Sequence, residues 1–384
     1  METLILGWYV LVETGSVFLL ALFASLQYVG TLVAPFIGVL ADRIGRGYVL
    51  AAMRAIYASL AALLMTFALL DVLTPAHVFV IATLTGVVRP SDMGMRVALV
   101  GDTMPSGQLI GAMGIERTTS DSARIAGALS GAGLVALLGI GFAYMCVAAL
   151  YAISFFLTLK VARMRTGRAA LVPVQITSPW QELKDAAGYV RQTPHLAGTM
   201  CLAFLINLTA YPFTNGLLPY VAKDVYGTDQ TGLGYLVAGF ASGALIGSLA
   251  LSRQGRTIRA GRMMLVFCAA WYLMIIAFAQ VETRGAGIIV LMLVGCAQSL
   301  GMVPMAALLL RHSDPQYRGR LMGLRMLAIY GMPLGLMVAG PLISRFGFRV
   351  TAMIYAATGL TFVLAIAVRW RDHLWSRSAP ANRR

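Results

Sequence analysis

Apolar runs of about 20 residues recur along the whole chain, each long enough to cross the ~30 Å hydrocarbon core of a bilayer as a helix. Of the 384 residues, 59% are hydrophobic and only 12% are charged, too few charges to cover a water-soluble domain of this size. The ten-residue alternation typical of a membrane β-barrel is absent from the sequence. Because helices satisfy their backbone internally in lipid, the sequence predicts an all-α polytopic membrane protein.

The apolar runs predict eleven complete membrane-spanning helices. They cover residues 16–40, 49–70, 76–100, 109–138, 141–161, 196–221, 232–251, 263–279, 285–310, 321–343 and 349–368. The segment Leu4–Val12 is also apolar, but it is too short to span. We expect it to be the outer half of a first helix whose first part is missing from this sequence, through truncation or a misassigned start codon.

The basic residues fall in the short loops between apolar runs, and they set the expected orientation. If the loop after Leu40 is cytoplasmic, 20 of the 30 Lys and Arg lie in cytoplasmic loops or the C-terminal tail, and only four lie outside. This pattern accounts for the net charge of +15 without a nucleic-acid partner. We expect a multi-pass protein of a bacterial plasma membrane (the inner membrane of a Gram-negative cell) with a cytoplasmic C-terminus.

The loop sequence GVLADRIGRG, Gly38–Gly47, stands between the runs 16–40 and 49–70. It resembles the loop between the second and third helices of the major facilitator superfamily, a group of secondary transporters. The matching residues are Gly38, Asp42, Arg43, Gly45 and Arg46, whereas Gly47 replaces the usual last basic residue. The resemblance implies two pseudo-symmetric six-helix halves, the first helix here being truncated, and a gate in which Asp102, at the end of run 76–100, pairs with Arg43 or Arg46.

The longest polar stretch divides the chain into four predicted parts. These are an N-terminal helical half at 1–161, a central cytoplasmic loop with an amphipathic helix at 162–195, a C-terminal half at 196–370 and a basic tail at 371–384. Arg43–Arg46 and Arg253–Arg256 occupy matching loops of the two halves, which indicates an internal repeat. Sequence near Leu218–Gly227, Arg318–Arg320 and Pro333–Gly335 resembles the enterobactin-exporter-like, transmembrane secretion effector group, whose members are exporters.

Two stripes of charge interrupt the apolar helices, and they are the candidate coupling or substrate sites. The first is Arg89, Asp92 and Arg96, and the second is Arg117, Asp121 and Arg124; each stripe falls within about 60° on its helix. Glu116 lies roughly 100° from the second stripe. Charges facing lipid are costly, so both stripes are expected to face the interior and each other.

Two interpretations of the stripes remain open. In one, Asp121, Glu116 or Asp92 takes up a proton while an arginine binds an anionic or polar substrate; in the other, the charges form a static interhelical network. The sequence shows no nucleotide-binding loop or hydrolase constellation, so we expect no enzymatic activity and no bound cofactor or metal. The driving force is then expected to come from an ion gradient or from the substrate itself.

The functional prediction is therefore a proton-coupled exporter of a small organic molecule, drug-like or siderophore-like, that acts by alternating access. It is expected to be monomeric, with the bilayer, the substrate and the proton as its partners. The alternatives are an importer of the same superfamily and a membrane sensor or partner subunit that does not transport.

Overall fold

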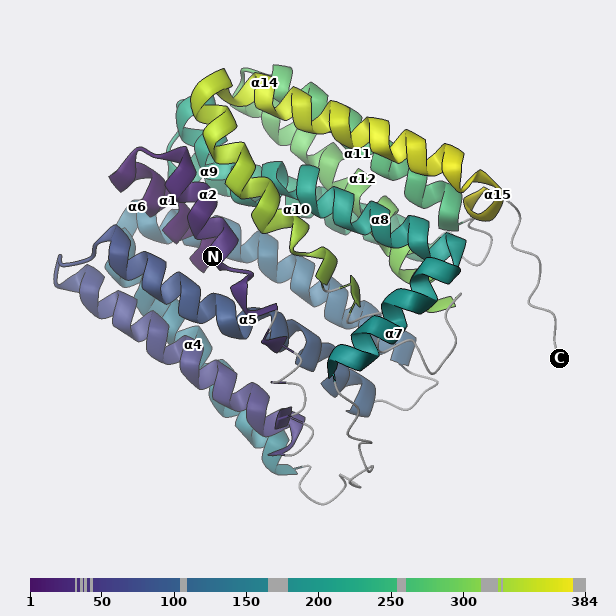
Figure 1. Cartoon of the computed structure of the whole chain (residues 1–384). Helices are drawn as coiled ribbons and strands as arrows, with labels where there is room; N and C mark the ends of the chain where they lie inside the picture. The colour runs from purple at the N-terminus through teal and green to yellow at the C-terminus, as the bar shows by residue number, and fades with distance from the viewer. Residues whose placement is uncertain are drawn as a thin grey trace. The chain divides into compact units, whose positions relative to one another are not determined.

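The computed structural model describes residues 1–31, 33–34, 37, 40–41, 44–103, 109–164, 179–253, 260–311, 324–325 and 327–375. Every regular element among these residues is a helix, which confirms the predicted all-α class. The helices form two compact units (Figure 1): unit 1 contains Met1–Ile176 and Asp229–Gly234, and unit 2 contains Thr177–Thr228 and Tyr235–Arg384. The predicted boundaries of the four parts of the chain stay predictions.

Most helices lie on the predicted spans. In unit 1 they are α1 (Glu2–Thr14), α2 (Val17–Leu26), η1 (Val29–Thr31), α4 (Arg46–Leu69), α5 (Pro75–Thr103) and α6 (Leu109–Met164). The remaining helices are α7 (Pro179–Gln192), α8 (Pro194–Thr209), η2 (Pro212–Gly216), α9 (Leu218–Tyr220), η3 (Val221–Val225), α10 (Gln230–Arg253), α11 (Ala260–Gln280), α12 (Arg284–Arg311), α14 (Gly331–Arg369) and α15 (Arg371–Leu374).

Two glycines divide the longest helical segments where the sequence predicts separate spans. Gly139 breaks α6 with φ 81° and ψ 175°, and Gly347 breaks α14 with φ 78° and ψ 166°. Side-chain-bearing residues rarely adopt such positive φ values, so glycine allows the chain to change direction with almost no connecting loop. The predicted pairs 109–138 with 141–161 and 321–343 with 349–368 meet at these breaks.

The predicted span 196–221 is wrong as one regular helix. Helix α8 ends at Thr209, and the chain continues through the π-helical segments η2 and η3. Pro212 and Pro219 lack the backbone N–H that a regular helix needs, and a wider π turn accommodates the resulting mismatch. One of its hydrogen bonds runs from Leu217 N to Pro212 O at 3.0 Å.

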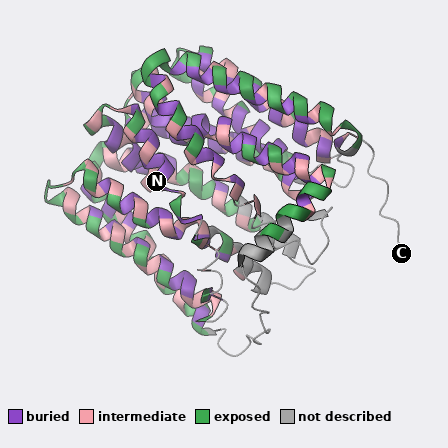
Figure 2. Cartoon of the chain, viewed as in Figure 1, coloured by how far each residue is buried: buried purple, intermediate pink, exposed green. Residues whose placement is uncertain are grey.

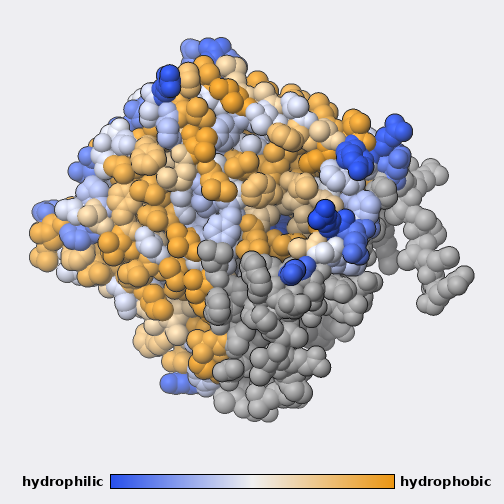
Figure 3. All heavy atoms as spheres, in the orientation of Figure 1, coloured by the Kyte–Doolittle hydropathy of each residue, from blue (hydrophilic) through white to orange (hydrophobic). Residues whose placement is uncertain are grey.

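Six described helical segments are long and apolar enough to cross a bilayer: Arg46–Leu69, Thr118–Arg163, Gln230–Leu251, Ala260–Gln280, Arg284–Leu309 and Gly331–Arg369. Their outer faces carry apolar side chains, such as Leu137 at 84% exposure and Phe156 at 66%. Exposed and buried residues alternate around each helix (Figure 2), and hydrophobic residues cover most of the described surface in view (Figure 3). Such a surface is stable in lipid rather than in water.

Helix α4 packs along the second part of α6, with which it runs antiparallel (Figure 1). At one end of the pair, a Cβ atom on Gly47 would lie 2.9 Å from the Cβ of Ala162; at the other, a Cβ on Gly141 would lie 2.6 Å from Leu69 Cδ2. Small residues at both ends therefore let the two backbones approach closely, as is typical of membrane helices.

A glycine stripe on α10 fixes the core of unit 2. Gly239, Gly243 and Gly247 follow one another at four-residue intervals, so they share one face of the helix. A Cβ on Gly243 would meet Met292 O of α12 at 1.8 Å, and a Cβ on Gly295 of α12 would meet Phe240 O at 2.0 Å. The two helices thus pack backbone against backbone, which only glycine permits.

Candidate functional site

The structure describes only part of the loop motif Gly38–Gly47, to which the sequence resemblance assigns a gate. Gly45 precedes α4 with φ 104°, a conformation that favours glycine, and its carbonyl accepts hydrogen bonds from Tyr48 N and Val49 N in the first turn. Arg46 is the first residue of the helix. Gly38, Asp42 and Arg43 lie outside the described residues, and for Asp102 only the backbone, in α5, is described.

Gly47 has a packing role that accounts for its departure from the motif. A Cβ there would meet both the Cβ of Ala162 at 2.9 Å and its Cα at 3.1 Å. Neither atom belongs to a flexible side chain, so any larger residue at position 47 must push α4 away from α6.

We therefore expect Gly47→Arg, which restores the usual basic residue, to destabilise the protein by about 1–3 kcal/mol through overpacking. The measurement is the thermal unfolding midpoint of purified protein. Gly188→Arg on α7 is the matched control, because a Cβ at Gly188 meets no atom within 4 Å. Equal midpoints for the two variants would contradict the packing role of Gly47.

A buried ion pair joins α4 to α5 in the interior of unit 1. Arg54 Nη2 lies 2.7 Å from Asp92 Oδ1, and the two side chains are 13% and 9% exposed. Arg54 also lies over the ring of Tyr57, one turn further along α4, at 5.8 Å from the ring centroid. Because isolated charges are costly at membrane depth, Arg54 and Asp92 each supply the opposite charge that the other requires there.

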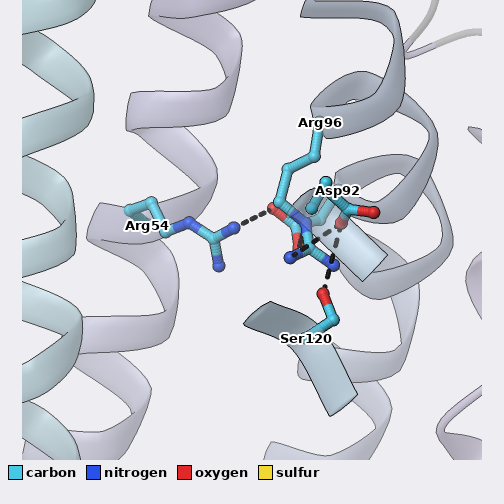
Figure 4. A network of polar contacts seen from close by, with 5 residues as sticks. Arg54, Asp92, Arg96 and Ser120 are labelled. Atoms are coloured by element: carbon cyan, nitrogen blue, oxygen red, sulfur yellow. Dashed lines mark hydrogen bonds and ion pairs between the residues drawn. The ribbon is translucent and has the colours of Figure 1, made fainter. Parts of the chain in front are cut away.

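The network continues from α5 to α6 through Arg96 (Figure 4). Arg96 Nε lies 3.7 Å from Asp92 Oδ2, and Arg96 Nη1 lies 3.9 Å from Glu116 Oε1. Glu116 in turn accepts a hydrogen bond from Ser120 Oγ at 3.2 Å. Two arginines and two carboxylates from three helices thus form one cluster whose formal charges cancel.

Two atoms of this cluster are buried without a hydrogen bond among the described residues: Asp92 Oδ1 and Arg96 Nε. The contact from Arg54 to Asp92 Oδ1 is short but lacks hydrogen-bond geometry, and the contacts of Arg96 exceed hydrogen-bond distance. The network is therefore electrically balanced but leaves one acceptor and one donor unsatisfied.

Arg89 belongs to a second polar cluster rather than to this network. Its Nη1 donates to Thr3 Oγ1 of α1 at 3.2 Å and to the Gln27 side-chain oxygen near the end of α2. Nearby, Tyr151 of α6 donates to Glu2 Oε2 at 3.0 Å. This cluster connects four helices of unit 1 and places Glu2, an acid absent from the sequence-based site, within electrostatic range of Arg89.

The expected meeting of the two charge stripes stays a prediction, because the side chain of Arg117 is not described. Arg89 lies about 10 Å along α5 from Arg96. It contacts Thr3 of α1 and Gln27 near the end of α2, whereas Arg96 contacts α6. On α6 the residue that meets Arg96 is Glu116, which stands apart from its own stripe. Asp121 is buried at 1% exposure, Arg124 is exposed, and the side chain of Arg117 is not described.

Arg54 is the functional candidate that the sequence-based hypothesis leaves out. A signal for it was present, since a lone arginine within an apolar run requires a partner in the membrane. Which acid that partner is depends on the packing of α4 against α5, and sequence spacing does not encode it.

An open hollow of about 300 Å³ lies beside the network. Its lining combines polar and apolar side chains from α4, α5 and α6: Leu50, Arg96, Leu99, Glu116, Thr119 and Ser120. The Arg96 guanidinium and the Glu116 carboxylate are therefore accessible from one side of unit 1.

Helices long and apolar enough to span a bilayer are typical of a polytopic membrane protein, and charges held between such helices are typical of a transporter. The sequence model described as Major Facilitator Superfamily matches residues 3–330 and 200–384, and the chain belongs to that family. A comparison with curated proteins gives no significant match.

Solved structures of two transporters share the fold. A variant of the nucleoside transporter NupG is 18% identical, with a TM-score of 0.72 over 95% of this chain and 94% of that one. The human organic anion transporter MFSD10 (TETRAN) is 16% identical, with a TM-score of 0.63 over 91% of this chain and 83% of that one.

Proposed function

We propose that this member of the superfamily is a proton-coupled exporter of a small organic molecule that acts by alternating access. The observation that carries the proposal is Asp92, a carboxylate 6% exposed and held between Arg54 and Arg96. An acid in this setting stays ionised while its cationic partners are close and takes up a proton when they move away.

The movement of helices between two states would supply this change. If α4 shifts, Arg54 separates from Asp92, which then loses its closest described cationic partner in a low-dielectric interior. If α6 shifts, Glu116 separates from Arg96, which is then free to move relative to Asp92. Glu116 and Asp121 are further candidates for the same step. A static network, the competing interpretation, would keep the same ion pairs in both states.

The remaining parts of the proposal rest on resemblance and charge distribution. Export follows from the similarity of several segments to the secretion effector group, and the orientation follows from the basic loops. In this proposal Asp42, Arg43, Arg46 and Asp102 form the cytoplasmic gate, and the protein works as a monomer in a bacterial plasma membrane. An importer uses the same machinery in the opposite direction.

The test is transport by purified protein in sealed proteoliposomes with an imposed pH gradient. A nucleoside, an organic anion and a drug-like cation are suitable probes, since the first two are named for transporters of the same fold. We expect at least one probe to move against its gradient in exchange for protons, and the movement to stop when an uncoupler collapses the pH gradient. Uncoupler-insensitive transport would reject proton coupling, and transport only in the direction of proton flow would favour the importer.

A further inference from the structure

The hollow beside the network points to a substrate class, an inference that rests on the transport function proposed above. Three of its lining residues are polar and accessible: the Arg96 side chain is 39% exposed, that of Glu116 is 26% exposed, and Thr119 is exposed. Such side chains are costly against lipid, so this side of unit 1 is not suited to a lipid contact. In a transporter, polar side chains that avoid lipid and remain accessible are candidates for the substrate path.

The described charges at the hollow balance one another. Arg54 and Arg96 face Asp92 and Glu116, so the four described side chains of the network carry no net formal charge. An ion that entered the hollow would lose its hydration without gaining an uncompensated opposite charge. An anion would compete with Asp92 and Glu116 for Arg96, and a cation would meet Arg96 as a like charge.

The hydrogen-bonding capacity of the hollow, by contrast, is not used up. The Arg96 and Glu116 side chains, 39% and 26% exposed, line the hollow together with Ser120. The ion-pair distances from Arg96, 3.7 Å to Asp92 and 3.9 Å to Glu116, are too long for hydrogen bonds. Since a guanidinium offers only donors and a carboxylate only acceptors, the lining of the hollow offers both.

We propose that this hollow binds neutral polar molecules whose hydrogen-bond donor and acceptor lie side by side, as in a carboxamide or a lactam ring. Arg96 donates to the acceptor of the ligand, and Glu116 accepts from its donor. Leu50 and Leu99 cover the apolar part of the ligand. The volume of about 300 Å³ lies at the small end for ligand sites and suits a molecule of one or two rings.

Three probes of the same shape separate the possibilities: benzamide is neutral with a donor and an acceptor, benzoate is an anion, and benzamidine is a cation. Their binding is measured by ligand-observed NMR or calorimetry on purified full-length protein in nanodiscs, without a pH gradient. We expect benzamide to bind the wild type about fivefold or more tightly than either ion, because each ion leaves one polar group unpaired. Equal binding of all three, or a preference for an ion, would overturn the proposal.

Charge substitutions in the hollow provide the second arm. Glu116→Gln leaves one excess positive charge and should shift the preference toward benzoate, whereas Arg96→Gln should shift it toward benzamidine. Lys160→Gln, at a separate hollow lined by Phe156, Leu159 and Arg163, is the matched control and should leave the order unchanged. An unchanged order in folded Glu116→Gln protein would also overturn the proposal.

These experiments can reject proton coupling and the neutral substrate class independently of each other. Binding in the expected order combined with uncoupler-insensitive transport would reject proton coupling alone. Gradient-driven transport combined with a preference for ions would reject the neutral substrate class alone. Wild-type binding by itself decides the substrate class if a charge variant does not fold.

Discussion

Replacing Asp92 with asparagine should reduce proton-driven transport roughly tenfold or more, because the variant keeps the shape of the side chain but cannot exchange a proton at membrane depth. The measurement is the initial transport rate under an imposed pH gradient, normalised to folded protein. Asp71→Asn is the matched control: Asp71 is exposed at a φ of 56°, which asparagine tolerates, and transport should be unchanged.

The same substitution also leaves Arg54 with a neutral partner, so stability must be measured in parallel. Breaking a buried ion pair from one side costs about 3–5 kcal/mol, whereas removing both charges together costs less. We therefore expect the double variant Arg54→Gln/Asp92→Asn to regain much of the thermal stability lost in Asp92→Asn, but not its transport. Recovery of coupled transport in the double variant would show that Asp92 is a structural residue and that Glu116 or Asp121 is the acid to test next.

Gly243→Ala should prevent most of the protein from reaching its folded state. The added methyl group would lie 1.8 Å from Met292 O, and backbone atoms of α10 and α12 cannot yield by that much without separation of the helices. The measurement is the yield of monodisperse protein after extraction from the membrane, with thermal unfolding of whatever is recovered. Gly285→Ala on α12 is the control, since a Cβ there meets no atom within 4 Å.

Along α10, the loss of folded protein should be larger where the added methyl group lies closer to its nearest neighbouring atom. Gly239→Ala places its methyl group 2.9 Å from Cγ2 and 3.1 Å from the backbone O of Ile288, a much smaller overlap than at Gly243, so we expect a milder loss. A yield for Gly243→Ala equal to that of Gly285→Ala would contradict the backbone packing of α10 against α12.

Local signals in the chain were sufficient for the helices and for most of their ends. Hydrophobic runs placed α4, α10 and α11 to within a few residues, because a span must be apolar over its whole length. The two breaks predicted from the apolar runs coincide with Gly139 and Gly347, whose positive φ values favour glycine. The apolar run at 196–221 predicted one regular helix, and this was wrong. Hydrophobicity indicates that a segment lies in the membrane but not its backbone geometry, and the π turns after Thr209 accommodate two prolines.

The candidate site was only partly predictable from the sequence. A charged residue in a membrane span indicates that a partner of opposite charge exists, but it does not indicate which residue that partner is. The sequence alone predicted that the charges of the two stripes, including Asp92 and Arg96, face the interior rather than lipid, because lipid cannot solvate them. Only the tertiary structure selected Arg54 as the closest partner of Asp92, separated Arg89 into another cluster and gave Gly47 its contact with Ala162. The physical reason is that hydrophobicity and backbone preference belong to consecutive residues, whereas ion pairing and close contact depend on which helices lie side by side.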